Sequence, residues 1–598
     1  MAQTEPHAPS SNSLFRYRHM FMTDGRRNFR PPVMACALLC AVLGAGLLAG
    51  CSSAYYRTAA DRQVYGILGD KELALHGSTN ALHIDTPYSA RDPKEIPAPE
   101  IIADRAQAGQ QVVSLEDALR LAVQLNRQYQ FQKETLYLTA LTLTGDRREF
   151  ARQPVALFNT ALVRDRDKSV DGNAGGQLSV SQLLKNGGTV SASLVSDVLR
   201  YFSLTSDPQR SILNTLSLKF TQPLLRGAGV EVVAENLKQS ERDVIYALRS
   251  FSQYQKSFAV DVVTTYFRLL QRKDAVRNSY ENYRNLIKAR ERAEALAKDR
   301  LPAFQADQAR QDELRAKSTY IAAVEQYRTE LDQFKVTLGV PIGTAIHLED
   351  AALKTLISTG LIPLHLTDDS GYELAVQRRP DLLNEIDQFE DSKRKIIVAA
   401  NALQPGLTFI ADTSLAAGAT DYANFDLHRF RSSAGLGLDL PVDRLLQRNL
   451  YRTATIKFER QLRTLATALD TARDRVRQNR RTLAQVRQNH VIQNNALDLA
   501  NKRVESAELL LQAGRAQIRD QLEAQTALVL AQNAVTQVVV DYHAARWKLL
   551  LDAGLLQIDG DRWWLQPQSP PAGDGAPPSP AANAVPRDIV TPDILFGQ

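Results

Sequence analysis

Apolar residues recur at alternating steps of three and four within a stretch that runs from about Asn449 to Gly554. Between Leu462 and Leu511 this stepping gives 15 positions, of which 12 are apolar. Three polar residues interrupt the pattern: Asn479, His490 and Gln493. A repeat sustained over this length without proline predicts one long helix whose apolar seam faces a partner helix in a coiled coil. At about 1.5 Å per residue, such a helix is roughly 100 Å long.

The long helix is expected to end in a tight turn at Ala513-Gly514-Arg515, and a second helix to run back to about Gly554. A weaker pattern of the same kind occurs earlier in the chain, where 11 of 16 positions between Val244 and Ala297 are apolar. It predicts a rod that begins near residue 232, turns at 299–302 and returns to about Thr337. The glycines and proline of 339–343 end that returning helix.

Between the rods the apolar period changes from 3.6 to 2, which is typical of strands. Apolar residues alternate with polar ones at three places: Leu178 and Val180; Val190, Ala192 and Leu194; Leu216, Leu218 and Phe220. Asn186-Gly187-Gly188 predicts a hairpin turn between the first two. One apolar and one polar face fits a membrane β-barrel with a water-filled lumen. It fits the half-buried sheet of a soluble sandwich equally well.

The chain contains an internal duplication. Leu121-Ala122-Val123-Gln124 recurs as Leu374-Ala375-Val376-Gln377, at an offset of 253 residues. Each copy begins a helix that is closed by a proline about 30 residues later and is followed by strands, at 407–411 and 434–440 in the second half. The first of these helices opens with a capping box at Ser114 and is expected to reach about Arg152. Both halves therefore predict helix, strands, long helix, turn and helix, with repeats at 112–338 and 370–556 joined by 339–369.

The chain begins with a targeting segment. Three arginines between residues 26 and 30 precede an apolar run from Val33 to Ala49, and the run ends in Leu48-Ala49-Gly50-Cys51. The pattern resembles a bacterial lipobox, which predicts a signal peptide at 1–50 and lipidation of Cys51. A transmembrane anchor with a chance cysteine is the alternative. Residues 51–111, with several prolines, are expected to be an extended tether, and the Pro/Ala-rich tail at 557–598 to be disordered.

Composition excludes some classes of function. The 598 residues are 44% hydrophobic and 23% charged, with a formal net charge of +6, and five arginines against two acids in the first 50 residues account for half of it. This balance gives no argument for nucleic acid binding. All cysteines lie at or before Cys51, so no disulfide or cysteine-based metal site is expected in the rest of the chain. No nucleophilic triad, phosphate-binding loop or metal-ligand cluster stands out, so we expect neither an enzyme nor a cofactor. We interpret His490, with Asn479 and Gln493, as a polar layer that sets helix register and not as a metal ligand.

Four short motifs complete the sequence evidence: Thr221-Gln222-Pro223-Leu224-Leu225-Arg226-Gly227; Arg379-Pro380-Asp381-Leu382; Leu440-Pro441-Val442-Asp443-Arg444; and Ala513-Gly514 with Asp520-Gln521-Leu522-Glu523-Ala524. In these motifs, their order and the duplication, residues 112–556 resemble the TolC-like outer-membrane efflux family. The resemblance implies a mainly α-helical homotrimer. Its twelve-stranded membrane barrel, four strands per protomer, is continued by an α-helical coiled-coil tunnel through the periplasm. The extra hairpin at 177–195 departs from four strands.

The resemblance implies a passive outer-membrane exit duct of a tripartite efflux or type I secretion system. A periplasmic adaptor would couple the duct to an inner-membrane pump. The alternative is a periplasmic adaptor or structural coiled-coil lipoprotein without a pore. An adaptor needs one hairpin and a structural rod needs no barrel, so the duplicated strand sets favour the channel.

The resemblance also identifies an entrance at the second helical turn. Asp520 and Glu523 match acidic positions that ring the periplasmic entrance of the family, where a threefold ring of carboxylates would favour cations. Ordinary solvated acids on a helix face are the alternative. The resemblance also implies an arginine at the tip of the turn that helps to hold the entrance closed. Ala516 stands at that position here, and Arg515 and Arg519, near Gly514, are candidates to replace it.

Overall fold

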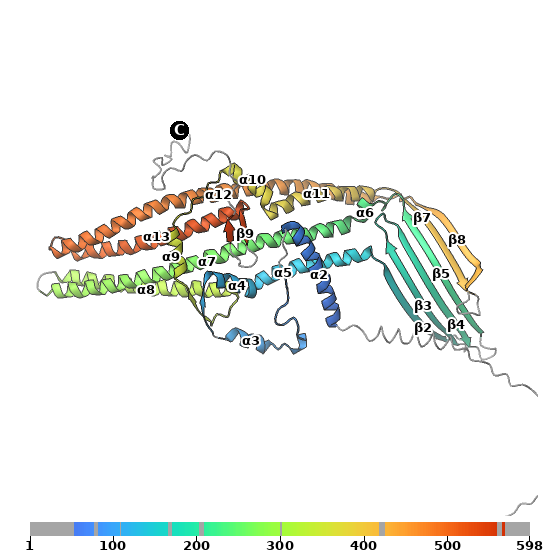
Figure 1. Cartoon of the computed structure of the whole chain (residues 1–598), viewed down its shortest axis with the longest axis horizontal. Coiled ribbons are helices and arrows are strands. Elements are labelled where there is room, and N and C mark those ends of the chain that lie inside the picture. The colour runs from blue at the N-terminus through green and yellow to red at the C-terminus, as the bar shows by residue number, and fades with distance from the viewer. Residues whose placement is uncertain are drawn as a thin grey trace, which may run out of the picture. The chain divides into compact units, whose positions relative to one another are not determined.

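The computed structural model describes residues 53–76, 82–107, 109–164, 170–202, 209–298, 302–417, 425–558 and 565–567. The chain divides into two compact units, residues 1–62 and 63–598. Figure 1 shows the helices and strands of the second unit. The expected signal peptide and Cys51 lie outside the described residues, as does all of the tail beyond residue 567.

The duplicated order of elements expected from the sequence is present. The first repeat contains α4 (Leu115–Leu125), α5 (Arg127–Glu149), β2 (Gln153–Arg164), β3 (Val170–Leu183), β4 (Thr189–Phe202), β5 (Gln209–Pro223), α6 (Val230–Val233), α7 (Glu235–Leu296) and α8 (Ala303–Leu338). The second contains α10 (Asp368–Arg378), α11 (Pro380–Asn401), β7 (Gly406–Ala417), β8 (Phe425–Asp439), α12 (Leu445–Gln512) and α13 (Ile518–Asp552). Between the repeats lie β6 (Ala345–Leu348) and α9 (Ala351–Thr359), and after the second repeat β9 (Leu556–Ile558) pairs with β10 (Leu565–Pro567).

The helix that opens each repeat is divided in two, where the sequence predicted one. In the first repeat the break falls at Asn126, whose side chain caps α5 by accepting from the Tyr129 amide at 2.7 Å and donates to the Thr337 carbonyl at 2.7 Å. In the second it falls at Arg379, because the following Pro380 disfavours helical backbone at the residue before it. The two breaks are 253 residues apart, the offset of the sequence repeat.

The segment expected to be an extended tether is partly helical. It contains α2 (Ser53–His76), a 3₁₀ turn (Pro93–Glu95), α3 (Ala98–Ala106) and β1 (Gln110–Val113). Val64 and Leu68 of α2 are buried in a cluster with Tyr129 and Tyr137 of α5. The prolines were misleading because Pro93 and Pro99 occupy the first turns of helices, where a missing amide hydrogen costs nothing.

The six long strands form one antiparallel sheet in the order β2-β3-β4-β5-β7-β8. The expectation of four strands per protomer is therefore wrong for this chain. The extra hairpin noticed in the sequence is β3–β4, and it lies within the sheet between β2 and β5 (Figure 1).

The sheet has one apolar and one polar face, and register keeps each face continuous across the strands. Leu194 of β4 lies opposite Leu178 of β3 and Leu216 of β5, and Leu216 lies opposite Leu415 of β7. The apolar side chains remain exposed in the single chain, for example Leu178 at 58% and Leu436 at 67%. On the other face Ser193 and Ser217 share a hydrogen bond of 2.7 Å, and Ser433 donates to Asp412 at 2.6 Å.

The helices pack in the same lateral order as the strands. Next to the sheet, α5 contacts α7, α7 contacts α11 and α11 contacts α12; beyond them α8 contacts α7, α7 contacts α13 and α13 contacts α12. One lateral edge of the unit therefore carries β2, α5 and α8, and the other carries β8 and α12. The sheet joins the helices at one end, as Figure 1 shows.

The predicted apolar seam of α12 packs against the rest of its repeat. Ala472, Val476 and Leu483 are buried in a cluster with Tyr542 and Leu549 of α13. The polar position Asn479 donates to the Asp552 carboxylate at 2.5 Å, so it joins α12 to α13. His490, whose pKa is lowered by burial, contacts Asn494 one turn further along its own helix and does not bridge the helices.

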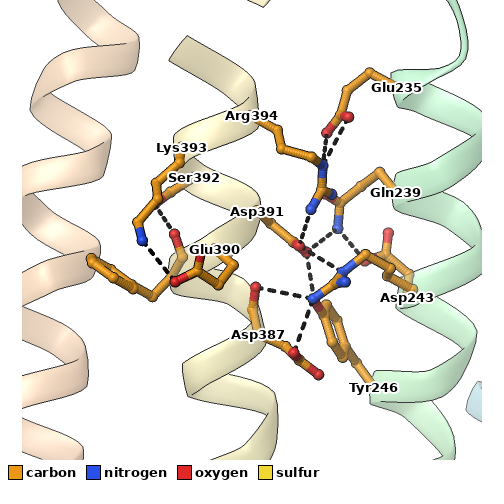
Figure 2. A network of polar contacts seen from close by, with 12 residues as sticks. Glu235, Gln239, Asp243, Tyr246, Asp387, Glu390, Asp391, Ser392, Lys393 and Arg394 are labelled. Atoms are coloured by element: carbon orange, nitrogen blue, oxygen red, sulfur yellow. Dashed lines mark hydrogen bonds and ion pairs between the residues drawn. The ribbon is translucent and has the colours of Figure 1, made fainter. Parts of the chain in front are cut away.

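A buried ionic cluster joins the two repeats between α7 and α11 (Figure 2). At its centre is Asp391 of α11, whose side chain is 3% exposed; it forms ion pairs with Arg242 Nε at 2.6 Å and Arg394 Nη1 at 2.8 Å. Tyr246 of α7 donates its hydroxyl to Asp391 at 2.6 Å. Burial, together with this hydrogen bond, raises the pKa of Tyr246, so the phenol stays neutral and remains a donor.

The cluster extends from Asp391 in both directions along α7. Arg394 also pairs with the buried Glu235 at 3.0 Å. Asp387, one turn before Asp391, pairs with Arg242 at 3.1 Å and with Arg249 at 2.5 Å. Three arginines and three carboxylates thus form alternating pairs that register the first repeat against the second.

We expect Asp391→Ala to lower the free energy of unfolding by about 3 kcal/mol, because removing one partner leaves Arg242 and Arg394 without their shared carboxylate in a largely buried site. Far-ultraviolet circular dichroism during thermal unfolding measures this loss. Lys393→Ala is the matched control on the same helix, since the Lys393–Glu390 pair is about half exposed and should contribute less than about 1 kcal/mol. Equal losses in the two variants would contradict the assigned role of Asp391.

Candidate functional site

The turn between α12 and α13 is built on Gly514. Its φ of 72° is left-handed, a conformation that side chains with a Cβ disfavour. The Gly514 amide donates to the Leu511 carbonyl at 3.1 Å and the Arg515 amide to the Leu510 carbonyl at 2.8 Å, which satisfies the free carbonyls at the helix end. The turn predicted from Ala513-Gly514-Arg515 is therefore present at the end of α12.

Asp520 takes part in the start of α13. One of its carboxylate oxygens accepts from the Gln517 amide at 3.0 Å, and the Gln517 side chain in turn caps the Asp520 amide. The side chain of Asp520 is exposed. A negative charge in the first turn also interacts favourably with the helix dipole.

Glu523 lies between two arginines. Its carboxylate is 3.5 Å from Nη2 of Arg503 on α12 and 3.1 Å from Nε of Arg519, one turn earlier on α13. All three side chains are about half exposed, so each pair contributes less than about 1 kcal/mol. Asp520 and Glu523 thus share an exposed surface with Arg503 and Arg519, and the site carries both signs of charge.

The opposite face of α13 is buried against the first repeat. Gln521 and Leu522 are buried while Asp520 and Glu523 are exposed. The contact consists mostly of alanines and a few larger apolar residues: Leu286, Ala289 and Ala293 of α7, Ala309 and Ala316 of α8, and Ile518 and Leu522 of α13. Small side chains let the two helical hairpins approach closely, and they direct the acidic face away from α7 and α8.

The two edge helices carry exposed apolar stripes that sequence analysis missed. Leu314 and Ile321 of α8 are seven residues apart, as are Ile492 and Leu499 of α12, and all four are more than half exposed. A spacing of seven on an exposed helix face is compatible with contact to a partner helix. On α12 the positions one heptad before and after this pair are Gln485 and Ser506, so the sequence holds no sustained second repeat that could have pointed to this face.

A cavity of about 630 Å³ lies between α11 and α12. Its lining includes four arginines, two acids and three threonines: Arg379, Arg460, Arg463, Arg475, Asp381, Glu385, Thr464, Thr467 and Thr471. Arg379 is neutralised by Asp381 at 2.6 Å and by Asp552 at 3.3 Å. Within the described ranges no group of three or more His, Cys, Asp and Glu side chains could hold a metal ion.

No protein-family model matches the chain, and no curated protein matches it. Solved structures do. The CmeC outer membrane channel of Campylobacter jejuni has 13% identity and a TM-score of 0.54, over 74% of this chain and 85% of that one. The open MtrE outer membrane channel of Neisseria gonorrhoeae has 12% identity and a TM-score of 0.51, over 74% of this chain and 88% of that one.

A third solved structure, the outer membrane protein VceC of Vibrio cholerae, has 13% identity and a TM-score of 0.51, over 74% of this chain and 96% of that one. At these identities the likeness shows the fold. The chain has the fold of TolC-like outer-membrane channels, and the resemblance predicted from its motifs is confirmed at that level. None of the helices in the described part of the chain is long and apolar enough to cross a membrane.

Proposed function

We propose that three copies of this chain form a passive channel in the bacterial outer membrane, the exit duct of a tripartite efflux or type I secretion system. The observation that carries the proposal is the sheet, whose apolar face is exposed while its other face is polar. A patch of this extent on a soluble monomer would be an aggregation hazard. Lipid outside and water inside satisfy both faces at once.

The lateral edges of the unit support closure by further copies. Among the described strands β2 and β8 each have a neighbour on one side alone, and a strand edge in lipid leaves backbone groups without hydrogen bonds. Because β2, α5 and α8 lie on one edge and β8 and α12 on the other, successive copies can join head to tail in a ring. The exposed stripes on α8 and α12 then meet as a coiled coil. The number three follows from the family resemblance.

The helices extend the channel away from the sheet and place the α12–α13 turn at the far end. We assign this end to the periplasmic entrance, with Asp520, Glu523 and the turn residues Gly514, Arg515 and Arg519 around it. A periplasmic adaptor and an inner-membrane pump would deliver the cargo there. The alternative, an adaptor or structural lipoprotein without a pore, is disfavoured because strands of both repeats join in one six-stranded sheet.

The full chain should sediment as a trimer in mild detergent and conduct ions in planar lipid bilayers. We expect Leu216→Lys, on the apolar face, to destabilise the inserted form by about 2–4 kcal/mol and to reduce the amount of trimer in membranes. Ser217→Lys, one residue on but on the polar face, is the matched control and should assemble normally. A monomer without conductance would favour the adaptor alternative. So would a fragment of residues 52–598 that stays soluble without detergent.

We propose that Cys51 becomes the lipid-modified N-terminus, with Leu48-Ala49-Gly50 as the recognition sequence for its processing. Mass spectrometry of the membrane-bound protein should detect an acylated peptide that begins at Cys51. Cys51→Ala should abolish the adduct but leave the trimer in the membrane, because the strands anchor it independently. An unmodified chain that retains residues before Cys51 would disprove the proposal.

The entrance assignment predicts ion selectivity. In a ring of three copies, Asp520→Asn with Glu523→Gln removes six carboxylates and leaves Arg503, Arg515 and Arg519, so preference should move from cations toward anions. Asparagine is chosen because it preserves the cap of α13. Reversal potentials in a salt gradient measure the change.

Asp470→Asn with Asp474→Asn is the control for the entrance variant. It removes the same charge from exposed positions in the middle of α12 and should alter selectivity less. Equal effects of the two variants would show that Asp520 and Glu523 are ordinary surface acids.

A further inference from the structure

We infer that the channel wall in the membrane is a barrel of eighteen strands, six from each of three copies, and that its lumen is nearly twice as wide as a twelve-stranded wall would allow. The inference rests on the proposed function and deepens it, because the width limits the size of cargo that can leave. It is based on the different number of strands in the two repeats.

The repeats differ by one hairpin. In the second repeat, β7 follows α11, β8 precedes α12, and the two strands are directly paired. In the first repeat the equivalent strands are β2, which follows α5, and β5, which precedes α6 and α7. They are separated in the sheet by β3 and β4. Residues 170–202 are therefore an insertion into an otherwise duplicated unit.

The inserted hairpin has one apolar and one polar face, and each continues the matching face of the neighbouring strands. Its apolar side chains, including Leu178 and Leu194, lie on the same face as Leu216. On the polar face Ser193 is hydrogen-bonded to Ser217 of β5. The ladders run along the whole length of β2 and nearly the whole length of β4. A hairpin folded outside the wall would lose both ladders and leave its apolar side chains without lipid.

The circumference of the helical layer agrees with eighteen strands. Next to the sheet each copy contributes α5, α7, α11 and α12, so three copies give twelve helices, and at about 9 Å between axes they span roughly 110 Å. Eighteen strands about 4.8 Å apart, tilted by about 40°, also span roughly 110 Å, whereas twelve strands span roughly 75 Å. A wall of eighteen strands thus meets the helices without narrowing.

The lumen of such a wall is wide. Its backbone diameter is about 36 Å, against about 24 Å for twelve strands at the same tilt. Side chains reduce this by about 5 Å on each side, half the distance between packed sheets, which leaves about 25 Å against about 14 Å. The polar face carries small residues such as Ser193, Ser217 and Ser433 beside longer ones such as Gln177, Lys219 and Arg431. The wall itself would therefore admit solutes up to about 25 Å across, and less where the longer side chains extend into the lumen.

Electron cryomicroscopy of the full-length trimer in lipid nanodiscs tests the inference. We expect eighteen strands, with β8 of each copy beside β2 of the next. A twelve-stranded wall with residues 170–202 outside it would overturn the inference while leaving the channel function intact. A chain that forms neither trimer nor pore would overturn the channel function itself.

Polymer exclusion gives a second readout. Deletion of residues 170–208 leaves 165–169 to join β2 to β5, as 418–424 join β7 to β8. Polyethylene glycols added from the outer side of a bilayer should enter the wild-type mouth up to a diameter of about 25 Å and the deletion channel up to about 14 Å. An unchanged cut-off would show that the hairpin is not part of the wall. The strand count in the wild-type images decides the matter independently of how the shortened chain assembles.

Discussion

The exposed apolar face of the six-stranded sheet is the constraint on which the other features of the chain depend. Leaving a leucine or phenylalanine in water forgoes about 1.5–3 kcal/mol, and Phe158, Leu178, Leu218, Leu436 and Leu438 are each more than half exposed. The apolar face runs across all six strands, so a contact with one side chain or one helix would leave most of it exposed. In the proposed channel lipid covers this face, and in lipid the strand edges at β2 and β8 would need further copies to complete their hydrogen bonds. The order of helices and strands, which puts different elements on the two edges, makes a ring the natural solution.

The energy that holds the two repeats together is distributed unevenly along the helices. At α11, next to the sheet, the contact between repeats is the buried network around Asp391, where loss of one partner is costly. Near the α12–α13 turn the contact between the repeats is instead an apolar cluster of alanines with Leu286, Ile518 and Leu522. The Glu523 pairs join α12 to α13 within the second repeat.

Sequence reasoning succeeded where one strong periodic signal determined the outcome. The heptad seam predicted α12 as one unbroken helix, and Ala513-Gly514-Arg515 predicted its end, because a left-handed residue at Gly514 satisfies the last carbonyls of that helix. It failed where two signals competed. The break at Asn126 was hidden inside an amphipathic pattern that continues across it, and the prolines before α3 indicated extension although they start helices.

The candidate site was harder to read. Gln517 is an unusual cap, so the engagement of Asp520 could not be foreseen, and the pairing of Glu523 with Arg503 depends on how two helices are placed across the turn. The sequence left the strand number open for a different reason. The alternation of β3 and β4 was visible in the sequence, but the resemblance supplied a count of four per protomer that the hairpin did not fit.

The connections of α12 show where along its length it is fixed. Near its middle, Arg473 pairs with Asp369 at the start of α10, Arg477 and Arg480 pair with Asp368, and Asn479 bonds to Asp552. Beyond Leu483 its buried residues are the small Ala500 and Ala507, and its neighbour is α13. Roughly the last 25–30 residues of α12 thus lie mainly along α13, over about 40 Å, and at their end Leu511 packs against the cluster shared by α7, α8 and α13. The α12–α13 hairpin is therefore joined to the first repeat near its turn by apolar packing, whereas the network around Asp391 joins the repeats next to the sheet.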